Sequence, residues 1–348
     1  MATAVRTLTQ RDLNRALLAR QLLLERTRTK LPRALERIGG LQAQYAPSMY
    51  IGLWSRLEGF ERGDLTRALE RRTVVQATLM RSTIHLTSGR DYWPFVVAIR
   101  RSRRERWLRT HRGAPSAREM AGLARRLRRR LADGPLRRAE IDQLLGRGSV
   151  GTNGVGLWLE LVRAPPSGTW EHRRADLYAA AEDWLGPADV NPQEAVEHLV
   201  RRYLGGFGPA SATDIAGWAG LRPKDIAPAL ERLRLRRFRA EDGEQLLDLP
   251  RAPLPDPDTP APARFLPVWD ATLLVHARRT GILPEEYRPT VFNTKTPHSV
   301  NTFLVNGEVA GTWSYEGGRV RLEPFSRLTG SVRRELGVEA ERLAAFHS

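Results

Sequence analysis

Two glutamines separated by one residue, Gln42 and Gln44, are the side chains whose type and spacing best suit chemistry in this sequence. They lie in the segment 39–45, between an amphipathic run and an aromatic-rich run. A carboxamide is neither acid nor base, but it can orient a water molecule and offer a carbonyl dipole to a developing positive charge. Such a pair suits only a reaction whose leaving group is already activated. The alternative is a polar helix end whose amides bond to the backbone.

Other candidate groups each have a structural alternative. Asp270 ends an apolar strand and could be catalytic, or it could cap the helix predicted after it. His85 could face a groove and His298 lies in a polar loop, but each could equally be structural. The seven histidines show no pair at metal-ligand helix spacing, so we expect no metal site. The glycine-rich segment 151–156 lacks the Lys-Ser/Thr of a phosphate loop and is interpreted as a flexible linker.

Composition excludes several classes of protein. The chain of 348 residues has no cysteine, which excludes disulfides, zinc–thiolate sites, iron–sulfur clusters and cysteine nucleophiles. No apolar run approaches the roughly 20 residues that span a bilayer, and the N-terminus lacks the apolar core of a signal peptide. We therefore expect a soluble, cytoplasmic protein of two or three domains, with no cofactor.

The net charge of +17 points to a polyanionic partner such as nucleic acid. The basic residues are almost all arginine, since Lys30, Lys224 and Lys295 are the only lysines. A compositional bias explains the preference for arginine, but not the excess of base over acid. Arginine runs at 100–106 and 125–130 lie on predicted helices, where they could neutralise phosphates or form a solvated helix face.

Apolar periodicity predicts a mainly helical α+β protein built from three cycles of helices followed by a short β-hairpin, as in a winged helix. The expected units are 1–98, 99–190 and 191–250, followed by a linker and a C-terminal β-containing segment over 251–348. The predicted helices are 8–25, 31–38, 49–57, 65–71, 94–110, 117–131, 138–145, 156–163, 178–185, 194–204, 212–219, 226–235 and 332–346. The predicted hairpins turn near Arg81, at Asp242-Gly243 and at Asn306-Gly307.

Several segments, in order along nearly the whole chain, resemble the winged-helix DNA glycosylases of the AlkZ type. They are 40–44, 52–57, 79–86, 165–170 with 173–178, 266–270 and 304–313. The resemblance implies tandem winged-helix units in a C-shaped arrangement with a concave face for duplex DNA. It also implies excision of alkylated purines, notably N7-alkylguanine adducts, and in some members the unhooking of interstrand crosslinks.

The family's glutamine–x–glutamine motif maps onto Gln42 and Gln44, which the resemblance makes catalytic. Sister enzymes carry Asp at the second position, so this chain resembles the branch that protects producers of DNA-alkylating natural products. The hairpin assigned to DNA in the family matches the turn at Asn306 and Gly307. Arg81 and His85 are further candidates for DNA contact.

The chemistry of the residues fits a monofunctional glycosylase. An N7-alkylated guanine carries positive charge, so two neutral carbonyl oxygens could stabilise the sugar cation and fix a water without a strong base. A lyase would need an amine, and no lysine lies near Gln42 in the sequence. The expected partner is double-stranded DNA, bound by a monomer without a membrane. The rivals are a non-catalytic winged-helix transcription regulator and an architectural DNA-binding protein.

Overall fold

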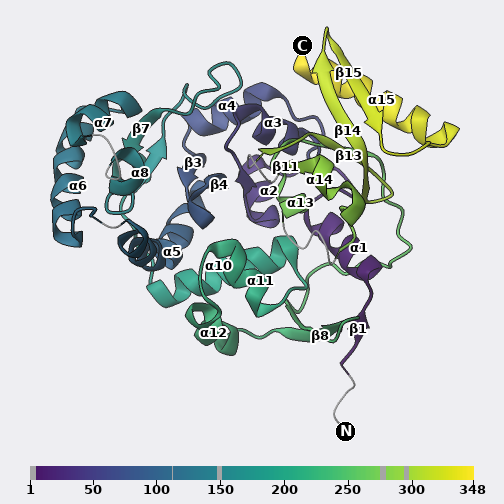
Figure 1. The fold of residues 1–348 in the computed structure, drawn as a ribbon, viewed down its shortest axis with the longest axis horizontal. Helices are drawn as coiled ribbons and strands as arrows, with labels where there is room; N and C mark the ends of the chain where they lie inside the picture. The colour runs from purple at the N-terminus through teal and green to yellow at the C-terminus, as the bar shows by residue number, and fades with distance from the viewer. Residues whose placement is uncertain (1–4, 112, 147–150, 275–279, 294–297) are drawn as a thin grey trace.

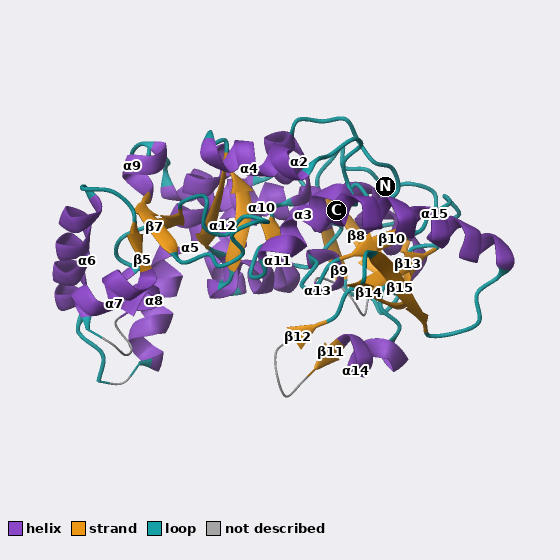
Figure 2. Ribbon diagram, turned by 90° about the horizontal axis from the view of Figure 1, so that it is seen from above, coloured by secondary structure: helices purple, strands orange, loops and turns teal. Residues whose placement is uncertain are grey.

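The computed structural model describes residues 5–111, 113–146, 151–274, 280–293 and 298–348. Figure 1 shows helices arranged around several small sheets, with the C-terminal strands and the last helix at one edge. Seen from above, α7 and α8 near one end and β11, β12 and α14 in the other half project to the same side, which gives the molecule a shallow C-shaped outline (Figure 2). The predicted α+β class, with a C-terminal β segment, is confirmed.

Helices and short strands alternate along the chain in the order that Figure 1 labels. The helices are α1 Gln10–Arg20, α2 Leu31–Ile38, α3 Ala46–Trp54, α4 Arg62–Glu70, α5 Gly89–Thr110, α6 Ala117–Leu131, α7 Arg138–Leu145, α8 Gly151–Val155, α9 Ala181–Leu185, α10 Pro192–Phe207, α11 Ala212–Ala219, α12 Pro223–Arg232, α13 Ala271–Leu274, α14 Arg288–Val291 and α15 Gly330–His347, with 3-10 turns η1 Met80–Ser82 and η2 Glu285–Tyr287. In the described part of the chain, none of them has the length and apolar character needed to cross a membrane.

One six-stranded sheet joins the first two expected units. Its order is β2 (Leu41–Gln42), β4 (Ile84–Ser88), β3 (Val74–Thr78), β6 (Leu161–Arg163), β7 (Leu177–Ala180) and β5 (Leu136–Arg137). The hairpin of the first unit, β3 and β4, therefore pairs directly with the strands of the second through β3 and β6. These two units share one sheet.

One predicted helix in this region, 156–163, is wrong, and another, 178–185, begins only at Ala181. Residues 161–163 are the strand β6 and residues 177–180 are the strand β7. Leu161, Val162 and Arg163 are all buried, and β6 pairs with β3 on one side and β7 on the other; a short strand buried in this way has no alternating pattern that would distinguish it from a helix. The segment 151–156, expected to be a linker, forms the short helix α8.

The third unit follows its prediction closely. Ser211 caps α11 through a capping box, and Gly220 ends that helix with a φ of 73°. Asp242-Gly243 joins β8 (Arg236–Ala240) to β9 (Gln245–Asp248) in a hairpin. The N-terminal strand β1 (Thr7–Leu8) pairs in parallel with β8, so the start of the chain completes this unit's sheet.

The C-terminal segment contains a four-stranded sheet covered by α15. After the predicted linker, which has no helix or strand before residue 264, the sheet order is β10 (Arg264–Leu266), β13 (Thr302–Val305), β14 (Glu308–Glu316) and β15 (Arg319–Pro324). A separate pair, β11 (Phe292–Asn293) and β12 (His298–Ser299), stands beside α14 in Figure 2. Lys295, between them, lies outside the described residues.

Candidate active site

Two glycines set the course of the chain at the glutamine pair. Gly39 ends α2 in the left-handed conformation, with a φ of 78°, and Gly40 follows with a φ of 84°. A Cβ on Gly40 would come within 3.0 Å of the Leu86 carbonyl oxygen, so only glycine lets the backbone approach β4 this closely. The chain then pairs with β4, with Gln42 opposite His85. The glutamines thus lie on an edge strand and the loop after it, and not at the helix end of the structural alternative.

The two glutamine side chains bond to each other. The Gln42 Nε2 amide donates to the Gln44 Oε1 carbonyl in a short contact. Gln42 is only 8% exposed, whereas Gln44 is exposed. Among the described residues, none donates a hydrogen bond to the side-chain oxygen Oε1 of Gln42, so this oxygen is available to a ligand or a water molecule. The pair can present fixed dipoles without carrying a charge.

Gln42 opens onto a cavity of about 440 Å³ that three parts of the chain build. Arg81 and Thr83 come from the turn between β3 and β4, and Trp269 comes from the segment after β10. The other lining residues lie on α10, α11 and α13, and they are Tyr203, Thr213, Asp214, Gly217, Trp218 and Leu274. Gln44 does not line the cavity and contacts it only through its hydrogen bond to Gln42.

Asp214 is the carboxylate among the described lining residues of this cavity. Its Oδ2 accepts the Ser211 backbone N–H at 3.0 Å and the Ser211 hydroxyl at 2.7 Å, as part of the α11 capping box. This cap explains why an acid is found here. The described lysines, Lys30 and Lys224, line no part of the cavity.

Arg81 and His85 lie close to the pair but in different environments. Arg81 lines the cavity, and its Nη1 donates to the Trp218 carbonyl at 2.8 Å. His85 is 3% exposed, its Nδ1 lies 3.1 Å from the Thr83 carbonyl oxygen, and burial lowers its pKa to about 4. A neutral, buried imidazole is poorly placed for a phosphate, so the position of His85 favours a structural role.

The turn at Asn306 and Gly307 faces α1. Arg15 Nη2 donates to the Asn306 side-chain oxygen at 2.7 Å, and Asn14 Nδ2 donates to the Gly307 carbonyl at 2.9 Å. Gly307 has a φ of 86°, and a Cβ there would lie 2.6 Å from Arg15 Nη1. The structure does not bring this turn to the glutamine cavity, and its contact with DNA stays a prediction.

Asp270 is held in a buried ion pair. Both of its carboxylate oxygens accept from Arg56 at 2.9 Å, and the two side chains are 1% and 0% exposed. Burial alone would raise the pKa of Asp270, but the Arg56 charge and hydrogen bonds from Arg56 and Thr272 outweigh it and hold the pKa below its usual value. Asp270 also accepts the Thr272 backbone N–H at 3.0 Å, as its capping alternative requires. His276, at the end of the helix predicted here, lies outside the described residues.

The residue before this ion pair was missed by sequence reasoning. Trp269 has a φ of 63°, which is unusual for a bulky side chain, and it lines the glutamine cavity. The Ser299 hydroxyl accepts its backbone N–H at 2.7 Å. The only sequence signal was its place beside Asp270, which had been considered for the acid alone.

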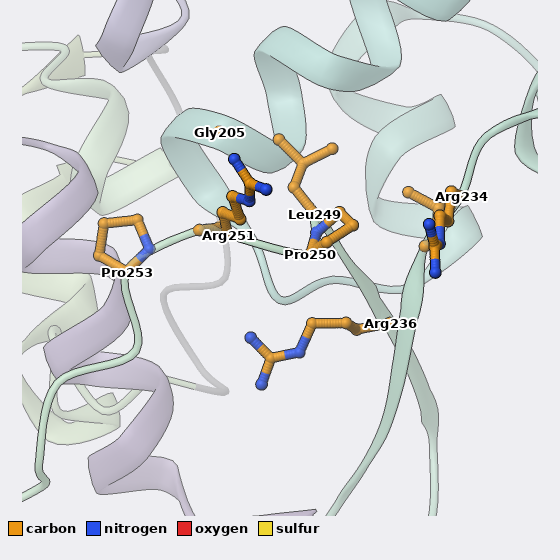
Figure 3. A pocket seen from close by; sticks show the side chains of 9 residues that line it. Gly205, Arg234, Arg236, Leu249, Pro250, Arg251 and Pro253 are labelled. Carbon is orange, nitrogen blue, oxygen red and sulfur yellow. The ribbon is translucent and has the colours of Figure 1, made fainter.

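A larger cavity, of about 870 Å³, lies elsewhere. Figure 3 shows Arg236 reaching from β8 below Leu249 and Pro250, with Arg234 and Arg251 to either side. Gly205 of α10 borders this cavity, whereas Tyr203 borders the glutamine cavity. Two positions along a helix differ by about 200° in direction, so the two cavities lie on opposite sides of α10.

The described residues contain no group of three or more His, Asp or Glu that could hold a metal ion. A neutral glutamine pair, an adjoining arginine and an aromatic-lined cavity on a basic protein make this the candidate site, and the net charge points to nucleic acid as the partner.

Comparison with known proteins identifies the family. The family model described as "DNA glycosylase AlkZ-like" matches residues 35–346, so the chain belongs to the AlkZ-like DNA glycosylase family. The structure is similar to that of Streptomyces sahachiroi DNA glycosylase AlkZ, with a TM-score of 0.79 and 18% sequence identity over 97% of each chain. No curated protein matches this sequence. The family predicted from the resemblance is confirmed, and DNA is its substrate.

Proposed function

We propose that this DNA glycosylase hydrolyses the N-glycosidic bond of alkylated purines in duplex DNA. The observation that carries the proposal is the neutral glutamine pair, with the Gln42 carbonyl oxygen available at the edge of a cavity. As the bond to a cationic base breaks, the sugar acquires oxocarbenium character. The Gln42 carbonyl dipole stabilises this charge, and Gln44 fixes the orientation of Gln42 and helps to hold the attacking water.

The absence of charge at the pair restricts the substrate. A neutral base leaves slowly without an acid to protonate it, whereas an N7-alkylated guanine leaves as a neutral product and needs no acid. A site whose groups are amides therefore favours bases that already carry a positive charge. Because no described lysine lines the cavity, we propose hydrolysis without a Schiff base, which leaves an abasic site.

Finer features of the proposal come from the family resemblance. We propose three winged-helix units around a concave DNA-binding face, in a monomer located in the cytoplasm. Interstrand crosslinks are proposed as substrates alongside monoadducts, and protection against a DNA-alkylating natural product as the biological role. Arg81 is the DNA contact that its position in the cavity supports best.

The test is base release from a duplex with a single N7-methylguanine, measured under single-turnover conditions with protein in excess. The double variant Gln42→Ala with Gln44→Ala should lose at least about a hundredfold in rate, as expected for losing preorganised dipoles, and should bind the duplex as wild type does. Gln143→Ala, an exposed glutamine on α7, is the matched control and should release base at the wild-type rate. Full release by the double variant would refute the assignment. Binding of undamaged DNA with no base release by wild type would favour a transcription regulator.

A further inference from the structure

A second cavity lies on the other side of Arg81 from the glutamine pair. It has a volume of about 350 Å³, and three arginines, Arg81, Arg103 and Arg106, line it. Neutral polar side chains complete it, including Ser82 and Asn153. Its described lining residues include no Asp or Glu. The cavity is therefore strongly basic, and it shares one wall with the candidate active site.

Helix α5 supplies one complete face of this cavity. Arg103, Arg106, Trp107 and Thr110 all line it, at positions i, i+3, i+4 and i+7. This spacing places the four side chains on one side of the helix. Of the arginine run at 100–106, only Arg103 and Arg106 thus line the cavity. The helix therefore has one face toward the cavity, and the other arginines of the run lie on its remaining faces.

Two of the three arginines, Arg81 and Arg106, form no ion pair with a described residue, whereas Arg103 is attracted by the Glu160 carboxylate. Arg103 Nη1 donates to the Thr78 carbonyl at 3.0 Å, while its Nε is buried with no hydrogen-bond partner. Arg106 is exposed and forms no ion pair with any described residue. Glu160 is shared, because it pairs with Arg100 at 3.1 Å and also attracts Arg103. A buried donor without a partner beside two free charges indicates a missing anion.

The turn that carries Arg81 and Ser82 is strained. Both residues have positive φ, of 52° and 61°, although neither is glycine. For a residue with a Cβ this conformation is less favourable than an ordinary one. Gly220 packs against this turn, where a Cβ would lie 3.3 Å from the Arg81 backbone nitrogen. Strain of this kind persists where the surrounding structure holds it, and it commonly marks a ligand contact.

The glycine-rich segment 151–156 contributes the opposite wall. Its short helix α8 places Asn153 and Gly154 at the cavity. Asp142 holds the segment, because its Oδ1 accepts both the Thr152 backbone N–H and the Thr152 hydroxyl at 3.1 Å. The segment that sequence reasoning dismissed as a linker is thus fixed beside three arginines.

We propose that this cavity binds a phosphodiester of the DNA backbone next to the nucleotide that Gln42 faces. Arg103 and Arg106 supply the charge, and Ser82 and Asn153 supply neutral donors. Arg81 borders both cavities, so the bound phosphate sets the distance between the backbone and the glutamine pair. This inference rests on the proposed function in one respect: the proposed function identifies the nucleotide that Gln42 faces as one that carries an alkylated purine.

The test compares two arginines on the same helix. Arg106 lines the cavity, whereas Arg109 is exposed three residues further on and does not. Duplex affinity is measured by fluorescence anisotropy over a range of potassium chloride concentrations. Arg106→Ala should weaken binding by about tenfold and reduce the slope of log affinity against log salt by about one. Arg109→Ala should leave the slope unchanged, and Arg106→Lys should restore most of it.

Equal losses in Arg106→Ala and Arg109→Ala would overturn the proposal, since they would reflect only the general positive field. An unchanged salt slope in Arg106→Ala would overturn the proposal too. If the slope is unchanged and inorganic phosphate raises the Tm of wild type but not of Arg106→Ala, the pocket binds a free anion and not the DNA backbone. If wild type releases no base while Arg106→Ala still lowers the slope, the proposed function fails and the phosphate site stands.

Discussion

Replacing Asp270 by asparagine tests whether this strand-end acid is structural. The buried Arg56 side chain would keep one carbonyl oxygen as an acceptor but lose the negative charge of its partner. The new amide N–H₂ group of the asparagine would face the N–H donors of Arg56. Removing one partner of a buried ion pair destabilises a protein by about 3–5 kcal/mol. The two 2.9 Å bonds between fully buried groups place Asp270→Asn within this range, near its lower end, because one acceptor remains.

The assay is urea unfolding followed by tryptophan fluorescence, with Asp189→Asn as the control. Asp189 is exposed, so its substitution should leave the midpoint unchanged. The contribution of Asp270 should also depend on pH in a defined direction. Its pKa is lowered in the folded protein, so its stabilisation is complete above the unfolded value of about 3.9 and is lost as pH falls below it. The gap between wild type and Asp270→Asn should therefore narrow only below about pH 4.

One pattern of results would refute this reasoning. If Asp270→Asn unfolds within about 1 kcal/mol of wild type, the ion pair has no structural weight. If the same folded variant binds duplex DNA but no longer releases base, Asp270 takes part in the chemistry. A loss of stability with base release retained at a temperature where the variant is folded would support the structural role.

Three further outcomes follow from buried or strained groups. Trp269→Ala should lower kcat/KM for a cationic base by about tenfold, and Trp269→Phe by less, because an indole face stabilises a nearby cation; single-turnover kinetics measure this. Gly307→Ala should lower the free energy of unfolding by about 1–3 kcal/mol, since its Cβ would overlap Arg15 and Asn14, as a urea titration would show. Burial lowers the pKa of His85 and His347 to about 4, so wild-type Tm should fall as pH drops from about 6.5 towards 4. Substituting either histidine with glutamine should flatten that fall.

Local signals in the sequence were enough to place many of the elements. Thr9 and Ser211 cap helices through their own side chains, and Gly220 ends one in a conformation that glycine adopts readily. Asp242-Gly243 turns a hairpin as expected. Each of these caps and turns depends on residues within four or five positions of one another, so the local sequence is enough to predict it. The end of α1 is different, because the chain turns at Leu22 with a φ of 58°, where apolar periodicity alone predicted five more helical residues.

Features that join distant segments could not be predicted in the same way. The pairing of β3 with β6 brings Ala77 beside Val162, and no local property of either strand specifies the other. The glutamine cavity combines residues that are more than a hundred positions apart, so Trp269 and Trp218 had no visible connection to Gln42. The glutamine motif itself was recognised through a family resemblance. Its chemistry in isolation left a structural alternative open.

The arginine beside the glutamine pair raises a difficulty that the second cavity resolves. A guanidinium that borders the cavity would repel both a cationic base and the oxocarbenium-like sugar, and in a poorly solvated site that repulsion is strong. A phosphodiester bound between Arg81 and Arg106 would offset this charge once DNA is in place. Catalytic stabilisation by the neutral carbonyl of Gln42 then becomes effective only in the complex with DNA. The two proposals are therefore coupled: the phosphate site determines when a pair of uncharged amides can act on a sugar cation.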